Sequence, residues 1–162
     1  MKKHLPIVVA IILLVVGGFL IWNTNTTGVE FNPKEVAVGD QYGIFTVIKV
    51  WYMPSTPSYP DNLYNIDFSG TTTIAGVFGQ APDTGCFIPL ENIATSTMQQ
   101  LPRSVLHPQI SHTLNLDVDD IPTADLPSAG DAVEVTIDRY VSAYTAKTCG
   151  GDYGHVTSIK KI

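Results

Sequence analysis

The chain has 162 residues, the length of a single domain, and only 15% of them are charged, against about 25% in an average soluble domain. The formal net charge is −6, and without Lys2 and Lys3 seven basic residues face 15 acidic ones, a balance of −8. Phosphate backbones repel a domain this acidic, so nucleic acid is excluded as a partner class.

A transmembrane helix is the first predicted element, at residues 5–22, where no side chain is charged or strongly polar. As a helix this segment reaches about 27 Å, close to the roughly 30 Å hydrocarbon core of a bilayer. Lys2 and Lys3 lie in the preceding tail, residues 1–4. The positive-inside rule therefore places that tail in the cytoplasm and the rest of this single-pass chain outside the cell membrane.

A cleaved signal peptide is the main alternative for this apolar segment, and a buried core helix is another. No small-residue cleavage pattern follows Phe19, and no Cys lies near the end of the apolar run to accept a lipid. We therefore expect an uncleaved signal anchor. Cleaved or not, the segment exports the remainder of the chain.

Residues 23–39 are expected to form a polar linker, and residues 40–162 an extracytoplasmic β domain. Apolar and polar residues alternate with period two along much of this domain, which is the pattern of half-buried strands. Gly70 interrupts one such run and indicates a bulge or a sharp bend. The predicted strands are residues 44–53, 64–74, 86–90, 112–118, 131–143 and 156–162.

One helix is predicted at residues 92–101, because the apolar residues of this segment share a helical face. Asn92 is expected to cap it and Pro102 to end it. A shorter helical turn can form between Asp119 and Leu126. About six strands, one short helix and no strand–helix alternation predict an all-β fold, either a small barrel or a sandwich.

The order of three strands, a helix and further strands over residues 43–162 resembles an OB-like barrel. Three segments, residues 68–78, 86–89 and 130–140, also resemble uncharacterised membrane-anchored small proteins of small-genome bacteria. Those proteins share the anchor, an F-x-G-type strand, a single C-F step and a terminal β pair. The resemblance implies a domain of unknown function and supplies no activity.

Cys86 and Cys149 are the only cysteines. In an exported domain two cysteines usually pair, so we expect a disulfide between them; two separate buried thiols are the alternative. The bridge closes a loop of about 64 residues, and loop-closure entropy then stabilises the fold by roughly 4 kcal/mol.

The segment that ends in Thr148 and Cys149 resembles the T-L-x-T-C strand of sortases, which are membrane-anchored cysteine transpeptidases of β-barrel fold. The resemblance implies a Cys149 thiolate, a His, and an Arg that stabilises the oxyanion. The chain departs from the pattern, because Ala146 replaces the Leu and both arginines, Arg103 and Arg139, precede the Cys. Its histidines also lie closer to the Cys than in that family. No catalytic motif remains, and we expect no enzyme.

Two groups of side chains could in principle bind a metal. The acidic stretch lacks the Gly and the closing Glu of an EF-hand, so it is read as a solvated loop. The histidines could form a site only if the fold brings them together. No metal or other cofactor is therefore expected. The acidic residues are Asp117, Asp119, Asp120 and Asp125, and the histidines are His107, His112 and His155.

The candidate binding surface is a loop rich in aromatic residues and proline, with Trp51, Tyr52, Met53 and Tyr59. Rigid aromatic loops offer a large contact area at a small cost in entropy; the alternative is that these rings fold back onto the domain. We expect a non-enzymatic binding or accessory module at the cell envelope, with an envelope protein, peptide or glycan as its ligand. A sortase-like enzyme using Cys149 and a structural subunit of a membrane assembly are the alternatives.

Overall fold

The computed structural model describes residues 29–57, 61–82, 87–107, 111–145 and 151–162. The predicted anchor at residues 5–22, Tyr59, Cys86 and Cys149 lie outside these ranges. Within them, no helix combines the length and the apolar character that crossing a membrane requires.

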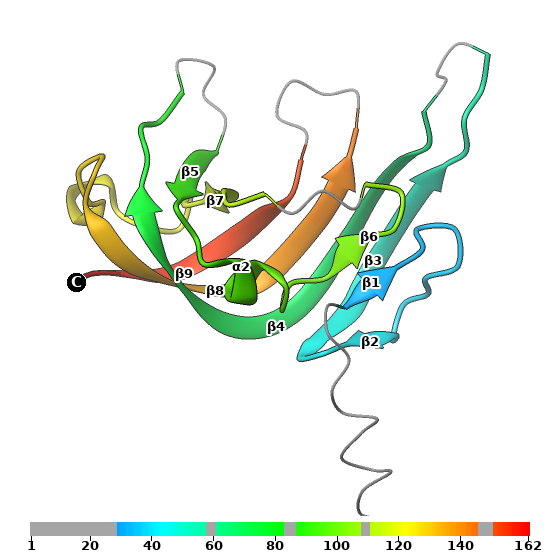
Figure 1. Cartoon of the computed structure of the whole chain (residues 1–162), viewed down its shortest axis with the longest axis horizontal. Helices are drawn as coiled ribbons and strands as arrows, with labels where there is room; N and C mark the ends of the chain where they lie inside the picture. The colour runs from blue at the N-terminus through cyan, green and yellow to red at the C-terminus, as the bar shows by residue number, and fades with distance from the viewer. Residues whose placement is uncertain (1–28, 58–60, 83–86, 108–110, 146–150) are drawn as a thin grey trace, which may run out of the picture.

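The predicted all-β class is confirmed, since strands and one short α-helix make up the regular structure of the described residues. The six predicted strands correspond to the six longer strands of Figure 1. Three two-residue strands were not predicted, because two residues show no periodicity. The long strands are β3 (Phe45–Met53), β4 (Leu63–Phe78), β5 (Ile88–Glu91), β7 (Leu114–Asp117), β8 (Ala132–Tyr144) and β9 (Tyr153–Lys161); the short ones are β1 (Glu30–Phe31), β2 (Gln41–Tyr42) and β6 (Arg103–Ser104).

Five of the strands pair in a circle, which we call the five-strand ring. β4 pairs with β5, β5 with β7, β7 with β9, β9 with β8, and β8 pairs with β4 again. The β7–β9 pair is parallel and the other four are antiparallel. β3 and β2 extend the sheet from the first half of β4, outside the ring.

The bend predicted at Gly70 is confirmed. The register between β4 and β8 shifts between Ser69 and Thr72, and Figure 1 shows β4 as a long curved strand. A Cβ at Gly70 would lie 2.8 Å from the Ile44 carbonyl oxygen and 2.8 Å from Phe45 Cδ1. Glycine is therefore required here because the start of β3 crosses β4 at close range.

The hydrophobic core is built from alternate residues of the long strands, as period two requires. It also includes Phe31 and Val36, which are 2% and 8% exposed and lie in the range assigned to the linker. Residues 30–39 thus pack against the domain. Core members from the ring include Ile66, Phe68, Ile74, Leu90, Leu116, Val135, Ile137 and Val156.

The helix predicted at residues 92–101 is wrong in its extent, because α2 covers only Thr95–Met98. Asn92 does not cap it: the N-cap position is Ala94, and no side-chain hydrogen bond is made there. The four helical residues include two threonines and a serine, which favour helices weakly. One helical turn is enough to bury Ile93 and Leu101, which lie before and after it in the chain. The expected turn near residue 120 is the 3₁₀ helix η1 (Thr123–Asp125).

Replacing Gly70 with Ala is expected to lower the free energy of unfolding by roughly 1–3 kcal/mol, the cost of an overpacked contact. Denaturation of the full chain in detergent micelles, followed by Trp fluorescence, measures this. Thr71→Ala is the control, since Thr71 is the exposed next residue of the same strand. Equal midpoints for the two variants would show that the close approach at Gly70 does not determine stability.

Candidate functional site

A pocket of about 490 Å³ lies beside the ends of β4 and β8, under the segment 101–107 that carries β6. Apolar atoms from Met98, Leu101 and Leu106 form one part of its wall. Aromatic rings and hydroxyl groups form the rest. A single carboxylate, that of Asp152, lines it.

Three aromatic side chains, Tyr64, His107 and Tyr144, form what we call the aromatic stack. The His107 ring stacks on Tyr144 with 3.9 Å between ring centroids and 25° between planes. The Tyr64 ring lies 6.0 Å from His107 and 6.5 Å from Tyr144. Tyr64 and Tyr144 meet because they are direct partners in the β4–β8 register, which places both on one face of the sheet.

Asp152 accepts three hydrogen bonds at the pocket wall. Tyr140 donates its hydroxyl to Oδ2 at 2.8 Å, while the Ser142 hydroxyl and the Ala143 amide donate to Oδ1, each at 3.0 Å. β8 has its last partner on β9 at Val141, so Asp152 satisfies a β8 amide beyond the end of that ladder. Because β9 has no residue paired with Ala143 on that side of β8, a side chain supplies the acceptor.

Burial raises the pKa of Asp152, and its three hydrogen bonds and the nearby His107 charge lower it by less. Burial, together with the Asp152 charge, holds the pKa of Tyr140 well above its usual range. Burial also raises the pKa of Tyr64, and the nearby Ser104 hydroxyl lowers it by less. These tyrosines are therefore neutral hydroxyl groups near neutral pH, and among the described residues Asp152 is the acidic group and Arg103 a basic group of the wall.

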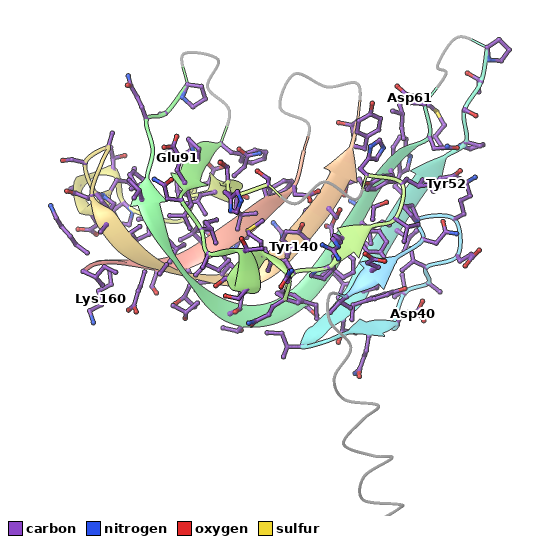
Figure 2. All side chains as sticks on the ribbon, viewed as in Figure 1. Asp40, Tyr52, Asp61, Glu91, Tyr140 and Lys160 are labelled. Atoms are coloured by element: carbon purple, nitrogen blue, oxygen red, sulfur yellow. The ribbon has the colours of Figure 1, made fainter. Side chains whose placement is uncertain are left out.

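The loop between β3 and β4 contacts a lining residue of this pocket through Asp61, whose Oδ2 accepts the Tyr144 hydroxyl at 3.2 Å. The neighbouring Asn62 accepts the Tyr52 hydroxyl at 2.8 Å. Figure 2 shows Asp61 and Tyr52 at the same end of the molecule, with Tyr140 deeper between the strands. One lining residue, Tyr144, is thus held by a hydrogen bond to the loop that precedes β4.

The predicted binding surface does not form the pocket. Trp51 is 44% exposed on β3, Tyr52 packs against the core, and Met53 is half-buried. Alternation along β3 separates them, since Trp51 and Met53 point to the opposite face from Tyr52. Tyr59 lies outside the described residues.

The pocket residues carried little signal in the sequence. Tyr64 and Tyr144 have the appearance of ordinary strand positions, and His107 stood out only as a possible metal ligand or catalytic His. Nothing marked Asp152. The one usable signal was aromatic residues near the ends of two predicted strands, but strand pairing is needed to bring them together.

The three histidines considered as a metal site contact different groups. His107 stacks on Tyr144, and His112 Nδ1 lies 3.2 Å from the Ile93 carbonyl oxygen. His155 lies between two carboxylates, with Nδ1 2.8 Å from Asp138 and Nε2 3.0 Å from Asp120. In the part of the chain that the structure describes, no cluster of three or more His, Cys, Asp or Glu could hold a metal ion.

Comparison of the chain with protein families, with curated proteins and with solved structures gives no match. The site must therefore be interpreted from its own geometry.

The His155 contacts predict a pH-dependent stability. Hydrogen bonding to Asp138 raises the pKa of His155 above its ordinary 6.5. The folded chain thus binds this proton more tightly than the unfolded chain, and the stabilisation is complete below pH 6.5 and lost as pH rises through the raised pKa. Because the carboxylates are exposed, we expect a change below about 1 kcal/mol.

Denaturation midpoints of the full chain, measured from below pH 6.5 to well above it, report this effect. H155Q is expected to flatten the decline in stability across that range, whereas H112Q, which removes a histidine without a carboxylate partner, keeps it. An unchanged slope in H155Q would contradict the assignment.

Proposed function

We propose that the chain is a membrane-anchored, extracytoplasmic binding module, and that it takes a group of an envelope protein, peptide or glycan into the pocket at the aromatic stack. The observation that carries this proposal is the pocket itself, which joins flat aromatic surface to hydroxyl groups and one carboxylate. Its volume of about 490 Å³ lies in the range of small-molecule sites. No catalytic motif supports an enzymatic role.

An OB-like barrel is the proposed form of the domain. It is supported by the five-strand ring, because an OB-fold is a small five-stranded Greek-key barrel. If the ring strands are numbered by their order in the chain, neighbours around the ring follow the order 1-2-3-5-4. The first of them is the long, bent β4. One departure is the connection between the third and fourth ring strands, where the described residues form only η1.

The position of β1 limits the length of chain between the proposed anchor at residues 5–22 and the domain. Because Glu30 already pairs with β6, the free tether after Trp22 shortens to residues 23–29. Seven extended residues span at most about 25 Å, so the domain stays close to the membrane. Protease treatment of intact cells tests this topology: a domain that is cut only after lysis would place it on the cytoplasmic side.

A disulfide between Cys86 and Cys149 belongs to the same proposal. Its support comes from two described residues that follow the cysteines in the chain, Phe87 and Tyr153. Their rings stack with 4.3 Å between centroids and 19° between planes. The side chain of the residue after Cys86 thus contacts that of a residue four places after Cys149, which would fit a bridge between the two cysteines.

A sortase-like enzyme remains the second candidate, for one reason. Arg103 and His107 line the same pocket as Gly151 and Asp152, which closely follow Cys149 in the chain. A His, an Arg and a thiolate are the groups that such a transpeptidase needs.

Alkylation of the full chain separates the two candidates. Without reductant we expect no alkylated cysteine by mass spectrometry, and with reductant we expect two, because the bridge protects both thiols. Stoichiometric labelling of Cys149 without reductant would disprove the bridge and favour the enzyme.

The binding role predicts that Tyr144→Ala weakens ligand binding at least tenfold, because truncating an aromatic anchor typically costs well over 1 kcal/mol. Saturation-transfer NMR on the full chain in lipid nanodiscs, with short peptides and oligosaccharides as probes, measures this. Trp51→Ala is the matched control, since Trp51 is an exposed aromatic residue that does not line the pocket. The reverse result, with binding lost only in W51A, would move the site to the aromatic loop.

A further inference from the structure

The carboxylate of Asp152 has hydrogen-bond donors but no cation among its contacts in the described residues. Its three donors are the Tyr140 hydroxyl, the Ser142 hydroxyl and the Ala143 amide, all of them neutral. A partly buried negative charge without a positive partner is costly, and neutral donors offset only part of that cost.

Among the described residues that line the pocket, Arg103 and His107 are basic, and neither is a direct hydrogen-bond partner of Asp152. Arg103 Nη2 lies 2.8 Å from Glu30 Oε1, so its charge is already balanced by another carboxylate. His107 is near enough for its charge to lower the pKa of Asp152, but its ring is stacked flat on Tyr144. The His107 charge also affects that pKa less than burial and the three hydrogen bonds do.

Asp152 retains the capacity for one more donor. A carboxylate offers about four lone-pair positions, and the three hydrogen bonds use two on Oδ1 and one on Oδ2. Because Asp152 lines the pocket, we assign the remaining position on Oδ2 to a donor from a ligand bound there.

The aromatic surface around this carboxylate suits the same kind of ligand group. Tyr64, Tyr140 and Tyr144 all line the pocket, and the faces of such rings attract ammonium groups. The balance of −8 in the chain beyond Lys2 and Lys3 adds a long-range attraction for cations. A carboxylate or phosphate ligand would instead face the charge of Asp152.

We propose that the pocket binds an alkylammonium group, with Asp152 as its counter-ion and the aromatic rings as its walls. The group comes from a lysine side chain or from the free amino terminus of a peptide. This inference rests on the proposed function and specifies its ligand: a basic peptide segment and not a neutral glycan.

Isothermal titration of the full chain in nanodiscs tests the proposal with three probes, at about pH 7, where an ordinary His is mostly neutral and an α-amino group is still mostly protonated. The probes are Nα-acetyl-lysine methylamide, its Nε-acetylated form and alanyl-alanine amide. We expect at least one of the two charged probes to bind at least tenfold more tightly than the diacetylated one. Tighter binding of the first identifies the lysine side chain as the source, and tighter binding of the third identifies the amino terminus.

Two isosteric variants supply the residue-level test. D152N is expected to weaken binding of the preferred charged probe at least tenfold, whereas D119N, which removes the same charge from an exposed residue outside the pocket, leaves it within twofold. Equal losses of affinity in both variants would show that the attraction comes from the net charge of the domain, which would overturn the proposal. If D152N does not fold, the comparison of charged with acetylated probe decides without it.

The results also separate a failure of the ammonium inference from a failure of the proposed binding function. Equal binding of charged and acetylated probes, or binding of neither, overturns the ammonium inference. If oligosaccharides then bind and Tyr144→Ala abolishes that binding, the pocket still functions as proposed and only its ligand class was wrong. If nothing binds at the pocket, both proposals fail.

Discussion

The fold depends on the bend of one strand. β4 is long enough to pair with β3 and β8 before Gly70, and with β8 and β5 after it. Without the bend, the first half of β4 could not pair with β3 in the open extension of the sheet while the second half closes the five-strand ring. The absence of a side chain at Gly70, where the start of β3 crosses, is therefore the constraint on which the ring and the extension both depend.

The pocket follows from the same geometry. Before the bend, β4 and β8 run on together beyond the first residue of β9, and their shared face at Tyr64 and Tyr144 is covered by the irregular segment around β6 instead of a ring strand. A loop-like cover packs less closely than a strand and leaves room for a ligand. Asp152 then has two roles, because it accepts a β8 amide beyond the β9 ladder and supplies a carboxylate to the space beneath that cover.

Much of the strand pattern could be read from the sequence, because period two is a local signal and the core residues of β4 and β8 display it over many positions. The bend at Gly70 was readable for the same reason. The helix was overextended because apolar spacing over residues 92–101 fits a helix equally well when only one turn forms. The pocket was not readable, since Tyr64, His107, Tyr144 and Asp152 meet only through strand register and a long connection. The anchor and the disulfide remain predictions from the sequence.

The two-residue pair of β1 with β6 has a mechanical consequence. Glu30 pairs with Arg103 and Phe31 with Ser104, and an ion pair reinforces the first of these contacts. Arg103 and Ser104 also line the pocket. β1 is therefore the first strand of the domain and pairs with a strand of the pocket wall. A force applied to the chain before β1 would act on that wall first and on the five-strand ring only through it.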